Sequence, residues 1–286
     1  MDYQYIKGYQ ANGSLLKSYF DFTRSVFRFD LSAWKNAGHW TDQYIPHSLA
    51  ERGRIIANAS ASLMQLQIMG RAVPAVQLGS VGVLPEYRGK GLSRIILAKV
   101  LEEYRHLPLM FLFANPSVLD FYPKFGFRRA KESAFRIDAS GCCAPRRKAA
   151  RINAGSEELR RLLRAKLQHS SIIDARGNLP IYWYHLMYNY SENLYYIEEK
   201  DVVFIAEYQG DRAVIADVLA ACPVNLAEII GYLADQDTRT IDFKFTPDWL
   251  GEKYEALPHE GESLFVRGEF LPEDGPDFQF PVTAHT

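Results

Sequence analysis

Residues Val81–Ser93 read Val-Gly-Val-Leu-Pro-Glu-Tyr-Arg-Gly-Lys-Gly-Leu-Ser, and this stretch decides the fold. It is typical of a strand that ends at Val83, a turn led by Pro85, and a glycine-bearing loop that opens a helix near Leu92. Such a loop directs several backbone N–H groups at one point, beside the positive end of a helix dipole. The sequence therefore predicts an anion site whose natural occupant is a phosphate or a pyrophosphate.

The composition is that of an ordinary globular protein. The 286 residues are 48% hydrophobic and 23% charged, which suits two modest domains or one large one. A formal net charge of −1 gives no global field that would favour nucleic acid or an anionic membrane. No stretch approaches the ~20 apolar residues of a membrane span, and the first residues lack the apolar run of a signal peptide. We therefore expect neither nucleic acid nor a membrane as a partner.

The three cysteines, Cys142, Cys143 and Cys222, form no metal-binding pattern. Two of them are neighbours, which is a poor geometry for bridging each other, and no pair of Cys-x-x-Cys type or Cys/His cluster with zinc spacing appears. We therefore expect no metal and a reduced, cytoplasmic location.

The elements around the opening stretch are those of an α/β unit. After mostly helical segments in the first 50 residues, we expect strands at 54–61 and 72–84, with 63–69 as a hairpin partner or a continuation of the first, then a helix at 92–105, an apolar strand at 109–113, a short helix at 117–125, and strands at 127–131 and 133–138. The last two strands are expected to complete this first unit.

The second half repeats this order loosely. We expect a helix at 157–168, a hairpin of 194–199 with 202–208, a strand at 212–221, a helix at 225–234, a strand at 240–245, a short helix at 249–256 and a strand at 263–267. The loop after Ala221 has neither a glycine pair nor an arginine, so it cannot offer the same amide cradle at low strain. We expect a first domain at 1–140, a linker at 141–154, and a degenerate copy at 155–286.

The opening stretch resembles a motif of the GNAT superfamily of N-acetyltransferases. Val81-x-Val83-x-Pro85, followed by Arg88-Gly-Lys-Gly-Leu-Ser93, is similar to the family's acyl-coenzyme A pyrophosphate motif, Gln/Arg-x-x-Gly-x-Gly/Ala. Serine at the last position departs from this pattern but is still small.

A second block agrees with the first. Asn115 with Phe121-Tyr-Pro-Lys-Phe-Gly-Phe127 resembles the family's Asn…Phe-Tyr-x-x-x-Gly-Phe block, with Val118 where alanine is common. The two blocks extend the resemblance over about Arg54–Asp138. The tandem layout and the stretch from Tyr44 to Ala57 are similar to the Eis-like branch, without the sterol-carrier-like third domain that its members often add.

The resemblance implies a fold, a co-substrate and a site. The fold is a mixed-sheet α/β (α+β) GNAT fold followed by a second, degenerate GNAT-like domain. The pantetheine arm of acetyl-CoA would pair with the strand of Val81 and Val83, and the loop amides would hold the pyrophosphate. The residues implied in binding acetyl-CoA are Val81, Val83, Arg88, Gly89, Lys90, Gly91, Leu92, Ser93 and Asn115. Tyr122 matches the general acid that protonates the leaving thiolate.

The activity implied is transfer of an acetyl group to a primary amine of a small molecule or peptide, by direct attack. One alternative is a non-catalytic acyl-CoA-binding or sensing protein with this fold, because fold alone does not fix function. Another is acyl transfer to a hydroxyl, or transfer from aminoacyl-tRNA. A homo-oligomer is left open.

Each functional interpretation has a structural alternative. Tyr122 is equally a packed aromatic beside Phe121 and Phe125, and Asn115 a turn residue before Pro116. The aromatic residues expected at the acceptor site or in the core are Trp34, His39, Trp40 and Tyr44, with Tyr182, Trp183, Tyr184, His185 and Tyr188 of the second half.

The general base is the least specified part of the site. Family members often carry a glutamate on the strand before the loop, but residues 72–80 contain no acid. The remaining candidates are His39, Asp42, His47 and Glu51. A neutral amine delivered through a water chain is an alternative to all four.

Overall fold

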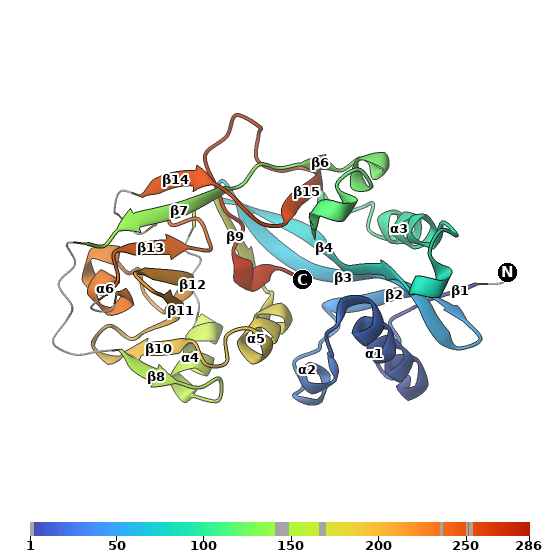
Figure 1. Cartoon of the computed structure of the whole chain (residues 1–286), viewed down its shortest axis with the longest axis horizontal. Helices are drawn as coiled ribbons and strands as arrows, with labels where there is room; N and C mark the ends of the chain where they lie inside the picture. The colour runs from blue at the N-terminus through green and yellow to red at the C-terminus, as the bar shows by residue number, and fades with distance from the viewer. Residues whose placement is uncertain (1–2, 141–148, 166–169, 235–236, 250, 252–253) are drawn as a thin grey trace.

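The chain folds around two β-sheets that lie side by side (Figure 1). The computed structural model describes residues 3–140, 149–165, 170–234, 237–249, 251 and 254–286. The basic cluster 146–148 and the cysteines 142 and 143 of the expected linker lie outside these residues. Within them, no helix is long and apolar enough to cross a membrane.

The first sheet has the strand order β1-β2-β3-β4-β5-β15-β6, and β9 pairs with the far end of β3. Its strands are β1 (Gln4–Lys7), β2 (Tyr44–Glu51), β3 (Arg54–Ile68), β4 (Arg71–Val83), β5 (Leu109–Ala114), β6 (Arg128–Arg129), β9 (Ile173–Arg176) and β15 (Ser263–Gly268). The second sheet has the order β14-β7-β13-β12-β11-β10-β8. Its strands are β7 (Ser133–Asp138), β8 (Ala150–Ile152), β10 (Leu194–Ile197), β11 (Val202–Gln209), β12 (Arg212–Ala220), β13 (Thr240–Phe243) and β14 (Glu255–Pro258).

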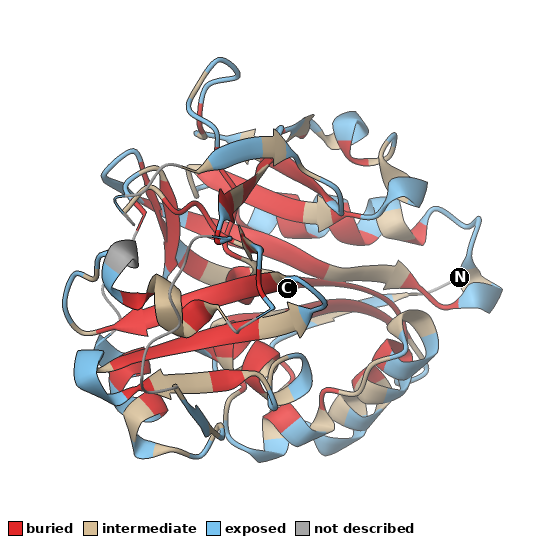
Figure 2. Cartoon of the chain, turned by 60° about the vertical axis from the view of Figure 1, so that its left-hand side comes forward, coloured by how far each residue is buried: buried red, intermediate tan, exposed pale blue. Residues whose placement is uncertain are grey.

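Helices cover both sheets. They are α1 (Gly13–Phe27), α2 (Ser32–Asn36), α3 (Leu92–Glu103), α4 (Glu157–Ala165), α5 (Leu179–Tyr188) and α6 (Leu226–Leu233), with single 3₁₀ turns η1 (Pro85–Tyr87), η2 (Pro116–Val118), η3 (Tyr122–Phe125), η4 (Glu198–Lys200) and η5 (Val282–Ala284). In Figure 1, α3 lies above the first sheet, and α1, α2 and α5 lie below it. Buried residues concentrate along the strands of both sheets (Figure 2).

The two halves exchange a strand. β7, from the first half, pairs antiparallel with β13 and β14 of the second sheet. In return β15, from the second half, pairs antiparallel with β5 and β6 of the first sheet. The prediction that residues 133–138 complete the first unit is therefore wrong, because their ladder partners come from residues 240–258. A cut within 141–154 would leave each sheet without one inner strand.

The central parallel pair of the first sheet opens into a V. β4 and β5 pair only over Ala75–Gln77 and Leu109–Phe111. After Gln77, β4 continues for six residues to Val83 without pairing to β5. This part of β4 stays bonded to β3 on its other side. The sheet is thus split between β4 and β5 at the carboxyl ends of both strands.

Several predicted elements differ in the structure. Residues 44–51 form β2 instead of a helical or irregular stretch. Residues 63–68 continue β3, which confirms the second of the two alternatives predicted for that segment. The short helix predicted at 117–125 consists of the turns η2 and η3. The helix predicted at 249–256 is wrong at its end, because residues 255–258 pair with β7 as β14. Helix α5 was not predicted, since its aromatic residues show no clear amphipathic pattern.

Candidate functional site

A β-bulge forms one wall of the V. The pairing of β3 with β4 shifts between Asn58 and Ser60, which face Gly82 and Gly79, so β4 carries an extra residue. Ser80 has a φ of 50°, and its carbonyl accepts a hydrogen bond from the Asn58 side chain at 3.0 Å. Ser80 and Val81 thus have no ladder partner on β3, and both residues line the cavity described below.

Two glycines allow other segments to lie directly on this wall. A Cβ on Gly79 would lie 2.6 Å from Oγ1 of Thr286, and a Cβ on Gly82 would lie 2.8 Å from the Phe27 ring. Any larger residue would have to displace these side chains. Sequence reasoning missed both glycines, although the pair within a strand is a recognisable signal for a bulge or a close approach.

The loop after β4 has the geometry of an anion cradle. Gly89 has a φ of 75° and Gly91 a φ of 74°, which is the left-handed region that favours glycine. Gly91 caps α3, and its carbonyl accepts from Arg94 N at 3.1 Å. A Cβ at either glycine would meet no protein atom within 4 Å, so the loop surface is open on the side where a ligand would lie.

The side chains of the loop take different directions. Lys90 lies over the Tyr87 ring, with Nζ 4.6 Å from the ring centre, and Arg88 Nε donates to Val83 O at 3.4 Å. Leu92 is buried in the core, so only its backbone is available to a ligand. Ser93 lines the cavity described next. The fixed part of the cradle is therefore the backbone, because its charged side chains lie at the surface.

A cavity of about 730 Å³ fills the V and extends to both sides of it. Val81 and Ser93 line it from β4 and α3, and Asn115 and Tyr122 line it from the end of β5 and η3. Val83 is buried and does not line it. The structure thus brings together four residues that the sequence predicted for one site, while the glycines of the loop lie just outside.

Tyr122 lies at the wall of this cavity. Its ring packs on Phe121, Phe127 and Phe265 with centroids 5.3, 6.1 and 5.8 Å away. Burial raises the pKa of Tyr122 to about 12, and the charge of Glu262 raises it as well. The phenol is therefore protonated at neutral pH and can donate a proton into the cavity. Among the described residues its hydroxyl has no hydrogen-bond partner.

Asn115 has a clear local role. Its Oδ1 accepts from Ser117 N at 3.0 Å and from Ser117 Oγ at 2.5 Å, which starts η2 just before Pro116. This is the turn role that the sequence left open. Asn115 also borders the cavity, and its side-chain NH₂ forms no hydrogen bond with any residue that the structure describes.

The other side of the cavity has an aromatic wall. Phe27 ends α1, Phe29 follows it, Trp34 lies on α2, Tyr44 begins β2, and Tyr184 lies on α5. Phe29 and Trp34 both contact the Tyr184 ring edge-on, with centroids 6.4 and 6.3 Å apart. The sequence predicted Trp34, Tyr44 and Tyr184 as candidates for this wall, but not the two phenylalanines.

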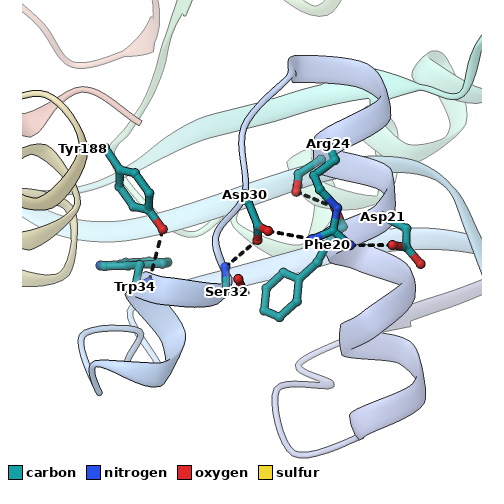
Figure 3. Close-up of polar contacts among 8 residues, drawn as sticks. Phe20, Asp21, Arg24, Asp30, Ser32, Trp34 and Tyr188 are labelled. Atoms are coloured by element: carbon teal, nitrogen blue, oxygen red, sulfur yellow. Dashed lines mark hydrogen bonds and ion pairs between the residues drawn. The ribbon is translucent and has the colours of Figure 1, made fainter.

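A polar network fixes the α1–α2 connection that carries this wall (Figure 3). Arg24 bonds Asp21 and Asp30 at 2.5 and 2.7 Å, and Asp30 accepts from Ser32 N at 2.8 Å. The backbone N–H of Trp34 donates to the Tyr188 hydroxyl at 3.2 Å, as Figure 3 shows.

The indole of Trp34 is held separately: its Nε1 donates to Pro180 O at 2.8 Å. Tyr188 and Pro180 both belong to α5, so this helix of the second half orients the wall.

The second half also lines the cavity directly. Ile181 and Tyr184 come from α5, Glu262 precedes β15, and Thr286 lies against Gly79. Tyr184 was a candidate from the sequence, whereas Ile181, Glu262 and Thr286 carry no motif and are identified only by their place in the folded chain. The site is therefore composite, built from residues on both sides of the expected linker.

None of the four base candidates named from the sequence lines this cavity. His47 is buried between the hydroxyls of Tyr5 and Tyr104, at 2.7 and 2.9 Å, and burial lowers its pKa to about 4. Asp42 is exposed outside the cavity. Glu51 accepts from the Tyr87 hydroxyl at 2.6 Å. His39 is considered with its aromatic neighbours below.

The other aromatic candidates have structural contacts. His39 stacks on Trp183, with ring centroids 4.4 Å apart, and Trp40 Nε1 donates to Tyr44 O at 2.8 Å. Tyr182 donates to Asp217 at 2.8 Å, and His185 Nε2 bonds His285 O at 2.9 Å. The structural interpretation thus holds for these residues.

No cluster of three or more His, Cys, Asp or Glu side chains that could hold a metal ion is found in the described part of the chain. The cavity walls instead offer backbone groups, the phenols of Tyr44, Tyr122 and Tyr184, the carboxylates of Asp120 and Glu262, and an aromatic surface. Such a set suits an extended organic ligand and a second, smaller molecule.

Comparison with known proteins gives a family for this arrangement. Residues 10–130 match the family model described as an acetyltransferase (GNAT) domain, and none of the curated proteins searched matches the chain. The matched region ends before β7, the strand given to the second sheet. It contains the bulge, the loop, Asn115 and Tyr122.

Solved structures share the whole layout. The chain is similar to a conserved protein of unknown function, a probable N-acyltransferase, from Enterococcus faecalis, at 15% identity over 94% of this chain and 73% of that one, with a TM-score of 0.65. Eis1 from Mycobacterium abscessus is similar at 15% identity over 93% and 73%, with a TM-score of 0.62. A GCN5-related N-acetyltransferase from Anabaena variabilis is similar at 15% identity over 92% and 72%, also with 0.62.

At these identities the likeness concerns the fold, and it extends over both sheets. Residues 10–130 are therefore similar to the acetyltransferase (GNAT) domain, and the chain as a whole has the mixed α/β fold of these structures, consistent with a tandem arrangement of two GNAT-like units.

Proposed function

We propose that this protein transfers an acetyl group from acetyl-CoA to a primary amine. The observation that carries the proposal is the single cavity that runs through the V, from the α3 side to the aromatic wall, with Tyr122 at its side. A thioester and an amine could meet there from opposite faces of the sheet.

The co-substrate would be held mainly by backbone. The amides of residues 88–93 would bind the pyrophosphate at the start of α3, where the helix dipole favours negative charge. The pantetheine arm would lie in the V, along Val81 and past Asn115, where β4 has no partner strand on the side that faces β5. Arg88 and Lys90 would add charge at the loop surface.

The reaction would proceed by direct attack of the amine nitrogen on the thioester carbonyl. A backbone N–H of the bulge would polarise the carbonyl oxygen, as fixed dipoles do in an oxyanion hole. The C–S bond breaks as the C–N bond forms, and Tyr122 would give its proton to the leaving thiolate. The proton lost by nitrogen returns to the phenolate through solvent, which balances the step.

The amine must be neutral when it attacks. An alkylammonium has a pKa near ~10.4, so presenting it neutral at pH 7 costs roughly 4–5 kcal/mol without help. Of the residues that line the cavity, Glu262 and Asp120 are the carboxylates available to receive this proton, directly or through water.

The second candidate is a non-catalytic acyl-CoA-binding or sensing protein. One observation favours it: His39, Asp42, His47 and Glu51 all lie outside the cavity lining. Such a protein would bind CoA without releasing thiol in the presence of amines.

One assay separates the two. The protein would be incubated with acetyl-CoA and a panel of primary amines while free thiol is measured, and CoA affinity would be measured by calorimetry. Thiol release above the blank supports the transferase. Tight CoA binding with no release for any amine would favour the sensor.

The domain roles and the location are part of the same proposal. The first half would hold the working acetyl-CoA site, and the second half would be a degenerate copy that lends α5 and β15 to it. The expectation that no metal is needed would be tested by measuring activity after treatment with a chelator. The expected cytoplasmic location would be tested by recovery of the protein in the cytoplasmic fraction.

A further inference from the structure

The charges that line the cavity are unevenly placed. Asp120 and Lys124 lie four residues apart in the η2–η3 segment, both exposed, so their opposite charges offset each other at that rim. Glu262 comes from the other half of the chain. It leaves one uncompensated negative charge on the cavity wall.

Glu262 sits where the V opens. Ser263 pairs with Ala114, the last residue of β5, so Glu262 is one residue beyond the end of that ladder. Its charge contributes to the raised pKa of Tyr122, which places the carboxylate within electrostatic reach of the phenol. Glu262 also borders a second cavity, of about 190 Å³. Glu262 therefore lies between the large cavity in the V and this smaller second cavity.

The Glu262 carboxylate has no ion pair or hydrogen bond with any described residue. The Glu262 side chain is exposed at the rim of the cavity, and desolvation by the surrounding protein raises its pKa. A carboxylate in this state is stabilised by a cation that enters the cavity with it. The Asp242 carboxylate, by contrast, forms ion pairs with both Arg136 and Arg212, at 2.6 and 2.7 Å.

The aromatic wall of the same cavity determines which kind of molecule can carry this cation. Phe27, Phe29, Trp34 and Tyr184 form a continuous ring surface. Trp34 is 1% exposed and its indole N–H is already bonded to Pro180 O, so this wall offers ring surface and no free indole donor. Such a surface favours an apolar or aromatic body and disfavours a polar polyhydroxylated one.

Resting on the proposed function, we propose that Glu262 receives the ammonium group of the acceptor, and that the aromatic wall selects a primary amine carried on an aromatic or apolar body, of the arylalkylamine class. Specificity is then divided between the halves. The first half supplies the acetyl-CoA side, and the second half supplies the charge that recognises the amine.

The test uses two measurements on the full chain. Thiol release from acetyl-CoA is followed with 2-phenylethylamine and with ethanolamine as a small polar amine. Binding of 2-phenylethylamine and of its uncharged analogue 2-phenylethanol is measured by calorimetry on the protein saturated with CoA. The variant is Glu262→Gln, and Glu260→Gln is the matched control, since Glu260 is a nearby acid that does not line the large cavity.

For the wild type we expect kcat/KM for 2-phenylethylamine to exceed that for ethanolamine by about tenfold or more. We expect Glu262→Gln to lower kcat/KM for both amines at least about tenfold, mainly through KM. The variant should lose the preference for 2-phenylethylamine over 2-phenylethanol in binding. CoA affinity should be unchanged, and Glu260→Gln should match the wild type.

Failures of the two proposals are distinguishable. Thiol release that Glu262→Gln leaves unchanged would overturn the role of Glu262 while the transferase stands, and equal rates with both amines would overturn the assigned substrate class. If no amine yields thiol, the transferase fails, and the binding measurement still decides whether Glu262 recognises a cation.

Discussion

The two parallel strand pairs of this protein, β4–β5 and β12–β13, begin alike and end differently. β12 and β13 pair over Arg212–Ile215 and Thr240–Phe243 and then separate, as β4 and β5 do after Gln77. The first opening holds a cavity of about 730 Å³. The second is bridged by the C-terminal segment: Val282 N donates to Lys244 O at 3.0 Å, and Thr283 Oγ1 donates to Asp217 at 3.0 Å.

The same segment is bonded on both of its sides. Thr246 donates to Gln279 O and accepts from Gln279 N, at 2.9 and 2.8 Å. The Glu132 carboxylate accepts from Phe280 N at 2.9 Å. The chain thus fills its second groove with its own backbone and leaves the first one open. The separation of two parallel strands therefore forms a groove in both halves, whereas a segment distant in sequence determines whether that groove is open to a ligand.

The loop after β4 and the loop after β12 also differ in whether they are available to a ligand. Gly89 and Gly91 adopt left-handed φ values in the first loop, whereas residues 221–225 of the second contain no glycine. The small cavity at the second loop, about 110 Å³, borders Lys200 and Glu228, which pair with each other at 2.6 Å. Four predictions test this contrast, in order of expected effect.

The largest effect is expected from Gly91→Val. A β-branched residue at φ 74° strains the turn and places a side chain where the pyrophosphate would lie, so CoA affinity should fall about a hundredfold or more in calorimetry. Gly53→Val is the matched control, because Gly53 has a φ of 78° and open space in an exposed hairpin. Cys222→Val, in the second loop, should also leave CoA affinity intact. Unchanged CoA affinity in Gly91→Val would refute the assignment of the loop.

Tyr122→Phe should lower turnover without affecting co-substrate binding. Loss of the phenolic proton should reduce kcat by about a hundredfold, while the Kd for CoA stays within about twofold. Tyr104→Phe removes another buried phenol, one that bonds His47 at 2.9 Å outside the cavity, and should leave kcat unchanged. A loss of CoA binding in Tyr122→Phe would instead make this residue a structural part of the wall.

Glu132→Gln probes the segment that fills the second groove. Burial raises the pKa of Glu132 to about 7, so its contribution to stability is present below about pH 4.5 and is lost as pH rises through 7. The amide keeps an acceptor for Phe280 N. As pH rises from 4 to 8, the free energy of unfolding of the variant should therefore increase by roughly 3 kcal/mol relative to that of the wild type. The Tm values of the two proteins should diverge accordingly.

The control for this measurement is Glu269→Gln, which changes an exposed carboxylate directly after β15. Its Tm difference from the wild type should be constant with pH. Parallel Tm curves for Glu132→Gln and the wild type would contradict the burial of a proton-binding carboxyl beside the C-terminal segment.

The smallest effect is expected from Thr283→Val. The change keeps the shape of the side chain but removes the hydrogen bond to Asp217, which should cost about 1–2 kcal/mol and lower Tm by about 2–4 °C. Thr41→Val, on the surface, should cost less. Both the wild type and Thr283→Val should bind CoA with a stoichiometry of one. A second CoA site in either of them would contradict the proposed difference between the two grooves.

Local features of the fold could be read from the chain. The left-handed φ values at Gly89, Gly91 and Gly126 follow from glycine at these positions, and the helix after the loop follows from its apolar periodicity. The apolar run at 109–113 predicted a strand buried on both faces. These predictions succeeded because each depends on interactions between residues close in sequence.

The strand exchange could not be predicted in this way. Ser133–Asp138 has the pattern of a buried strand, and nothing in it specifies whether β13 or β5 is its partner. Its partners lie at 240–243 and 255–258, about a hundred or more positions further along the chain, so local sequence does not specify them. The pairing of β7 and β15 is a property of the folded chain as a whole.

The sequence by itself determined the glycine loop after β4, the strand before it and the turns of the Asn115–Phe127 block, because glycine conformations and short-range turns are fixed locally. Tertiary structure alone decided that β15 brings Glu262 to the V, that α5 holds Trp34 in place, and that residues 279–284 close the second groove. Those contacts join residues more than thirty positions apart, and the burial that stabilises them exists only once both sheets have formed.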